Sequence, residues 1–235
     1  MTISAILTDI EGTTTPIAFV HEVLFPYARE RIGEFCAAHR DEPEVAAALE
    51  QARKLEGRPG LGLEETVALL IGWIDEDRKA GPLKTLQGLI WRSGYEEGVL
   101  KGRVYDDAAR YLARWRARGF ELYVYSSGSE EAQRLIFGHS DKGDLAKLFS
   151  GFFDTRMGAK LEAASYEAIA KAIGFPAEEI LFLSDHAGEI AAASEAFMEV
   201  ARIDRALVPE ASRREGGVLI AGSFAPVDRA FGLSA

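Results

Sequence analysis

The second half of the chain alternates between short apolar runs and longer amphipathic stretches. Segments rich in β-branched and aromatic residues predict strands at FELYVYS, GFFD, EEILFLSD and EVARID, and GGVLIAGSF is typical of one more short strand. Between them, helical spacing is found in DDAARYLARWRARG, SEEAQRLIFGH, EAASYEAIAKAIGF and AGEIAAASEAFM. Near the start of the chain, the apolar residues from Ile3 to Leu7 predict a further strand that ends at Asp9.

The stretch from about residue 17 to residue 100 has helical patterns only. Its first segment, HEVLFPYARERIGEFCAAH, places apolar residues near helical spacing despite one internal proline. Three more helices are predicted at EPEVAAALEQARKLEG, LGLEETVALLIGWIDEDRKAG and LKTLQGLIWRSGYEEG.

Alternating strands and helices predict a parallel sheet that is covered on both faces. The helical stretch interrupts this alternation directly after the first strand. We therefore expect an α/β fold, with a Rossmann-like parallel sheet core (residues 1–15 and 103–235) and an inserted all-helical cap (residues 16–102). Ligands of such sheets bind beyond the carboxyl ends of the strands, where the insert leaves the core. The insert is thus a candidate lid, and helices that merely pack beside the sheet are the alternative.

Composition narrows the function classes. The 235 residues are 48% hydrophobic and carry a formal net charge of −10, and no basic patch is visible, so a nucleic-acid surface is not expected. The single cysteine, Cys36, excludes an internal disulfide and a cysteine-rich zinc site. We find neither a signal-peptide pattern nor an apolar run of membrane-spanning length, and expect a soluble cytoplasmic protein with no membrane partner.

Polar residues gather where four predicted strands end. The first strand is followed by Asp9, Glu11 and Gly12 in DIEGTTTP, the second by the hydroxyl turn SSGS that begins at Ser126 and Ser127. Lys160 follows the third strand, and Asp185 follows the fourth. Singly, each is typical of a turn, a helix cap or a solvated position. Together, in this order at one sheet edge, they favour a functional site.

These residue types fit phosphoryl transfer through an aspartate. Asp9 is a candidate carboxylate nucleophile, and Mg²⁺ held by Asp9, Asp185 and waters would let it approach a phosphate. Lys160 supplies a point charge, and Ser126 with the amides of Ser127 and Gly128 offers an anion site. Glu11 is a candidate acid and base for the leaving oxygen and the attacking water. The threonines of this segment are expected to hydrogen-bond the carboxylates.

This set resembles the haloacid dehalogenase superfamily of phosphatases over the whole chain. Most of those enzymes have Asp-x-Asp at the first motif, where this chain has Glu11 in the second place. Five segments of the chain are similar to motifs of the enolase-phosphatases of methionine salvage: DIEGTTTP, VLFPYA, YSSGSEEAQRLIFGHS, FSGFFDTRMGAKLEAASY and ILFLSD. The resemblance implies a monomer with a helical cap and one Mg²⁺ per subunit. It also implies 2,3-diketo-5-methylthiopentyl-1-phosphate as the substrate, enolised first and then dephosphorylated to an acireductone.

The resemblance also assigns roles to individual residues. Asp9 would be the nucleophile and a metal ligand, and Glu11 the acid/base residue, with its main-chain carbonyl contributing to the metal site. Asp185 would complete that site. Ser126 and Ser127 would bind the phosphate group, which Lys160 would neutralise.

Two departures from the family pattern stand out. His186 follows Asp185 where many superfamily members have a second aspartate, and residues 197–217 lack an RPGN-like ending. Whether Glu189 orients a metal-bound water or only sits in a first helical turn stays open, and a solvated position is favoured for His186. Two other functions also stay open: a phosphatase of small phosphate esters without the enolase step, and a binding module without activity.

Overall fold

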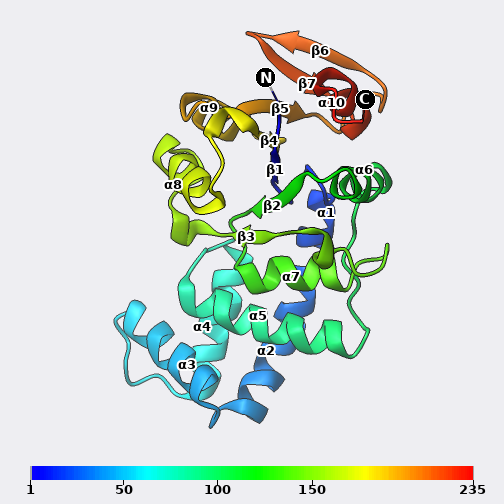
Figure 1. Cartoon of the computed structure of the whole chain (residues 1–235). Helices are drawn as coiled ribbons and strands as arrows, with labels where there is room; N and C mark the ends of the chain where they lie inside the picture. The colour runs from blue at the N-terminus through cyan, green and yellow to red at the C-terminus, as the bar shows by residue number, and fades with distance from the viewer. Residues whose placement is uncertain (1, 235) are drawn as a thin grey trace. The chain divides into compact units, whose positions relative to one another are not determined.

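The computed structural model describes residues 2–234, which form two compact units. One unit comprises the chain up to Ile17 and from Lys101 onward, and the other comprises Ala18–Leu100. Figure 1 shows the strands in the first unit and a purely helical second unit. Among the described residues, no helix is both long and apolar enough to cross a membrane.

The first unit is built on a seven-stranded sheet of order β3-β2-β1-β4-β5-β7-β6. Every neighbouring pair is parallel except β6 and β7. The strands are β1 (Ala5–Thr8), β2 (Glu121–Tyr125), β3 (Gly151–Phe153), β4 (Ile180–Ser184), β5 (Glu199–Ile203), β6 (Ser212–Glu215) and β7 (Val218–Ala221). This topology, with a helical insertion between β1 and β2, confirms the predicted fold class.

Helices cover both faces of this sheet because alternate strand residues point to opposite sides. Ala5 and Leu7 of β1 belong to a core cluster with α8 (Ala163–Ile173) and α9 (Ala187–Glu195). The opposite face carries α6 (Asp106–Ala117), α7 (Glu130–Gly138) and α10 (Phe224–Phe231), where Trp115 of α6 stacks on Phe224 of α10 at 5.3 Å. One-turn 3₁₀ helices link these elements: η2 (Ala146–Leu148), η3 (Thr155–Met157) and η4 (Ala177–Glu179).

The second unit consists of helices around one apolar core. The chain enters through α1 (Ile17–Phe19) and continues without a break through the π-helical turn η1 (Val20–Leu24) into α2 (Phe25–His39). Pro26 stands where the π-helical turn passes into α2: the Phe25 amide still bonds the Val20 carbonyl five residues back, and the missing N–H of the proline falls at this change of helix type. The other helices are α3 (Pro43–Leu55), α4 (Leu63–Asp75) and α5 (Gly81–Glu96). Cys36 is fully buried in this core, as its helical pattern predicted.

Two C-terminal elements were not predicted. β6 is exposed along its whole length and carries the sequence SRRE, which has none of the apolar alternation of a strand. It forms nonetheless because Gly216 and Gly217, both at positive φ, turn the chain into a hairpin with β7. α10 was missed because its short pattern merges with the preceding strand, although Ser223 caps it and Gly232 ends it in the left-handed region.

Candidate active site

Asp9 lies one residue beyond β1, in the middle of the parallel sheet. Thr8, the last residue of β1, pairs with Val124 of β2 on one side and with Leu183 of β4 on the other. The Asp9 amide donates to the Leu183 carbonyl at 2.8 Å, so β4 fixes its backbone. The side chain is nearly buried, with the residue 5% exposed. The carboxylate therefore stands where the carboxyl ends of three strands meet.

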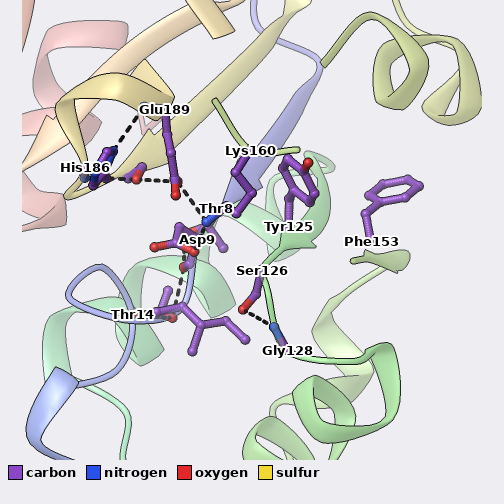
Figure 2. A network of polar contacts seen from close by, with 12 residues as sticks. Thr8, Asp9, Thr14, Tyr125, Ser126, Gly128, Phe153, Lys160, His186 and Glu189 are labelled. Atoms are coloured by element: carbon purple, nitrogen blue, oxygen red, sulfur yellow. Dashed lines mark hydrogen bonds and ion pairs between the residues drawn. The ribbon is translucent and has the colours of Figure 1, made fainter. Parts of the chain in front are cut away.

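Lys160 provides the positive charge next to this carboxylate. Its Nζ lies 2.6 Å from Asp9 Oδ1 and 2.8 Å from Glu189 Oε2, so one ammonium bridges two acids (Figure 2). Burial alone would lower the pKa of Lys160, but the charges and hydrogen bonds of Asp9 and Glu189 outweigh it and raise the pKa above its usual value. Lys160 is therefore a fixed cation at the site.

The backbone of the Lys160 loop is held by three side-chain hydroxyls. Tyr125 donates to the Gly158 carbonyl at 3.0 Å, Ser165 to the Ala159 carbonyl at 2.7 Å, and Tyr166 to the Lys160 carbonyl at 2.8 Å. Three consecutive carbonyls are thus paired by rigid, buried neighbours. This clamp was not predicted from the sequence, because both tyrosines occupy positions whose pattern is typical of an apolar core.

Glu189 and His186 have different roles at the start of α9. Glu189 is held by Lys160 and by the Ser184 hydroxyl, which donates to its Oε2 at 2.8 Å. It therefore contacts the site directly, which a residue of a solvated helical turn would not do. His186 is exposed, and its ring accepts from the Glu189 amide as the N-cap of α9. The solvated, helix-start position favoured for His186 is the one observed.

The loop after Asp9 is folded tightly on itself. The amides of Thr13, Thr14 and Thr15 all point to the Ile10 carbonyl, at 3.2, 2.9 and 2.8 Å, and the Gly12 amide donates to Thr15 at 2.8 Å. Gly12 has a φ of +70°, and a Cβ there would lie 2.0 Å from Asp185 Oδ2, so only glycine fits. Half-buried Glu11 lies on this turn, and its backbone forms an isolated parallel β-bridge with Thr15.

The expected bonds between the threonines and the carboxylates are not the ones observed. The Thr14 hydroxyl donates to the main-chain carbonyls of Asp9 and Ile10, at 3.2 and 3.3 Å. The Thr8 hydroxyl likewise donates to the Asp9 carbonyl. Thr13 Oγ1 and Thr15 Oγ1 are buried without a hydrogen-bond partner. This prediction was wrong because short side chains on a tight turn reach neighbouring carbonyls before they reach a carboxylate.

The Ser126 turn follows β2 and precedes α7. Ser126 is buried and its hydroxyl accepts from the Gly128 amide at 3.2 Å, so that amide is bonded within the turn (Figure 2). Half-buried Ser127 lies between them. Ser129, rather than Ser126 or Ser127, is the cap of α7 and accepts from Ala132. The Gln133 amide donates to the carbonyls of Gly128 and Phe153, both at 2.8 Å, and fixes the turn against β3.

Asp185 stands beyond β4, beside the loop of Gly12. Burial and the negative charge of Asp9 raise the pKa of Asp185 to about 6. The Lys160 ammonium contacts the carboxylates of Asp9 and Glu189, and its charge also acts on Asp185, so three carboxylates share this one ammonium and negative charge remains. In residues 2–234, no three His, Cys, Asp or Glu side chains are grouped as a metal site. Mg²⁺ does not need such a group, because it binds through one or two carboxylates and keeps several waters.

The chain matches known proteins along most of its length. Residues 3–196 match the family model of the haloacid dehalogenase-like hydrolases. The enolase-phosphatase E1 of Parvibaculum lavamentivorans is 64% identical over 228 residues, which cover 97% of this chain and 96% of that protein.

Solved structures agree with this match. The crystal structure of the UTR4 protein from Saccharomyces cerevisiae has a TM-score of 0.77 and 33% identity, and the match covers 96% of this chain and all of that one. The L-2-haloacid dehalogenase from Xanthobacter autotrophicus matches over both full lengths with a TM-score of 0.58 and 18% identity, a likeness of fold alone.

Proposed function

The chain belongs to the enolase-phosphatase E1 family of the haloacid dehalogenase-like hydrolases, which confirms the resemblance found in the sequence, and we propose that it acts on 2,3-diketo-5-methylthiopentyl-1-phosphate. In this reaction of methionine salvage, the diketone is enolised and the enol-phosphate then loses its phosphate to give the acireductone. The observation that carries the proposal is the buried carboxylate of Asp9, 2.6 Å from the Lys160 ammonium and two residues before Glu11.

In the phosphatase step, Asp9 is the nucleophile. One of its oxygens attacks phosphorus, and the bond between phosphorus and the substrate oxygen breaks as that oxygen takes a proton from Glu11. Glu11, now ionised, accepts a proton from the water that hydrolyses the aspartyl phosphate, so that Asp9 and the acid are both regenerated. The tight turn after β1 suits these roles, because it holds Glu11 at fixed spacing from Asp9.

Lys160 and the Ser126 turn hold the phosphate group. Lys160 remains protonated beside Asp9 and offsets the repulsion between the carboxylate and the phosphate oxygens. Ser126 and Ser127 donate to those oxygens. The Gly128 amide joins them only if its bond to Ser126 Oγ is exchanged for one to the substrate.

A magnesium ion would neutralise the negative charge that Lys160 leaves at the site. Asp9 and Asp185 would hold one ion, together with the main-chain carbonyl of Glu11 and waters. Burial and the charge of Asp9 raise the pKa of Asp185, and a bound cation would offset that repulsion. When bound, Mg²⁺ neutralises phosphate charge and polarises the diketone as a Lewis acid. The chain's own residues set the ion's place, because Gly12 lets the loop approach Asp185 closely.

A heavy-water experiment separates the two halves of the reaction. Phosphate release needs Asp9 as a nucleophile, whereas enolisation does not. Asp9→Asn with the diketo phosphate and Mg²⁺ in heavy water should take deuterium into the carbon beside the carbonyl while phosphate stays attached. The wild-type protein should release phosphate and form the acireductone. If the wild type releases phosphate with no enol-type product and no deuterium uptake, the protein is a phosphatase without the enolase step.

We further propose that the protein is a cytoplasmic monomer with one Mg²⁺ per chain. The absence of a basic patch in a chain of net charge −10 supports a small-molecule substrate rather than a nucleic acid. Sedimentation of the purified protein would measure the oligomeric state.

A further inference from the structure

Arg205 links the atypical C-terminal segment to the loop that carries Asp9 and Glu11. It follows β5 by two residues, inside the segment that departs from the family pattern. Its Nε donates to the main-chain carbonyl of Thr13 at 3.2 Å, and its Nη2 donates to the same carbonyl. Its Nη1 bonds both carboxylate oxygens of Asp107 at 2.9 Å.

The carbonyl that Arg205 binds needs a partner from outside the loop. Thr13 is fully buried. The amides of the loop donate their hydrogen bonds to the carbonyls of Ile10 and Thr15, and not to the carbonyl of Thr13. The Thr14 carbonyl accepts from the Tyr105 amide at 2.9 Å. A buried carbonyl without a donor is unfavourable. Arg205 therefore satisfies the Thr13 carbonyl from the side of β5.

The guanidinium is itself held rigidly. It lies over the Tyr105 ring, with Cζ 4.1 Å from the ring centroid. Asp107 also accepts from the Phe224 amide at 2.9 Å, so the start of α10 is tied to the same carboxylate. The Arg205 and Asp107 side chains are only 16% and 18% exposed, which strengthens the charge-assisted hydrogen bonds from Nη1 to the carboxylate. One arginine thus joins the starts of α6 and α10 to the loop beyond β1.

We propose that Arg205 is a positioning residue for catalysis, which keeps the Asp9–Thr15 loop in the geometry that phosphate transfer requires. It acts through the Thr13 carbonyl and touches no reacting atom. The proposal rests on the proposed function only in taking Asp9 as the nucleophile. Lysine cannot replace it, because a single ammonium does not span Asp107 and Thr13 with the planar fork of arginine.

The test compares Arg205→Ala and Arg205→Lys with Arg229→Ala, whose arginine pairs with Glu210 on the exposed surface of the same region. Phosphate release, KM and the melting temperature are measured for each. A cavity of about 380 Å³ is lined by Arg205, Gly12, Tyr105 and Asp185, and it offers a path for added methylguanidinium. We expect Arg205→Ala to lower kcat by roughly 10- to 100-fold with little change in KM, and methylguanidinium to restore part of the loss. Arg229→Ala should keep the wild-type kcat.

Three results would overturn the proposal. One is a wild-type kcat in Arg205→Ala. The second is a loss of kcat that methylguanidinium leaves unchanged. The third is full activity of Arg205→Lys. This variant provides the test if Arg205→Ala does not fold. A phosphate ester that the wild type hydrolyses is assayed in parallel with the diketo phosphate. If only the ester is a substrate, the enolase function fails while the Arg205 comparison still stands.

Discussion

The hydroxyl of Tyr166 donates to the main-chain carbonyl of Lys160 at 2.8 Å, while the ammonium of the same lysine is bound to Asp9. A buried aromatic residue of α8 therefore helps to set the position of the cation beside the nucleophile. The bond belongs to the three-hydroxyl clamp on residues 158–160, which makes its contribution measurable by single-atom deletions.

Tyr166→Phe removes this hydroxyl and keeps the ring, which packs edge-on against Phe182 at 5.0 Å. We expect the free energy of unfolding to fall by about 1 kcal/mol, because the Lys160 carbonyl loses its partner. The kcat for phosphate release should fall by roughly 2- to 10-fold as Lys160 is less well placed. Urea unfolding and a phosphate assay check both values. Tyr111→Phe on α6 is the control, and equal losses in the two variants would contradict a special role for the clamp.

Asp9→Asn should lower phosphate release by roughly 10³-fold or more, because an amide is a poor nucleophile and a weaker metal ligand. Asp41→Asn, at a carboxylate that is 95% exposed in the helical unit, is the control and should be without effect. The measurement is phosphate release under saturating substrate. Near-wild-type turnover of Asp9→Asn would end the covalent-aspartate mechanism.

Lys160→Met should cost at least ~2 kcal/mol of transition-state stabilisation, which is about 30-fold in kcat/KM. The variant leaves Asp9 and Glu189 without the ammonium that now lies 2.6 and 2.8 Å from them. Lys171→Met, at an exposed position in the last turn of α8, is the matched control. A kcat/KM equal to that of the control would show that Lys160 does not neutralise the phosphate.

Removal of Mg²⁺ with a chelator should abolish phosphate release, and added Mg²⁺ should restore it, because the site otherwise has excess negative charge. Asp185→Asn should weaken Mg²⁺ binding by at least about tenfold, measured by titration calorimetry without substrate. Glu195→Gln at the end of α9 is the control. Full activity in excess chelator would rule out a metal held by Asp9 and Asp185.

The stability of the helical unit should depend on alkaline pH through Cys36. Burial raises the pKa of this thiol to about 11 in the folded chain, whereas an unfolded thiol titrates near pH 8.5–9. The unfolded state therefore loses its proton first as pH rises from about 9 to about 11, and stability falls in that window by roughly 2 kcal/mol.

Denaturant unfolding of the wild type and of Cys36→Ala at about pH 8 and about pH 10.5 checks this expectation. The alanine variant should be less stable at the lower pH, because it leaves a small cavity. The gap should narrow at the higher pH. A gap that stays constant would show that the thiol does not titrate on unfolding.

The sequence by itself determined the order and type of most elements, because their signals are local. Strands such as residues 180–184 are continuous apolar runs, and the helices between them carry a clear 3.6-residue period. The position of Asp9 and Asp185 at one sheet edge also followed from the sequence, whereas Lys160 lies seven residues beyond β3 and is placed by the fold of its loop. In a parallel sheet, every residue that directly follows a strand lies at the same edge.

Tertiary structure alone decided which atoms meet at that edge. Nothing in the sequence distinguishes Glu189 as a partner of Lys160, because their contact depends on how α9 packs beside the Lys160 loop. The clamp of Tyr125, Ser165 and Tyr166 is invisible for the same reason, since a core position and a donor position have the same pattern. Arg205 and Thr13 are 192 residues apart. Their hydrogen bond exists because β5 and the loop beyond β1 end at the same edge of the sheet, and only folding brings those ends together.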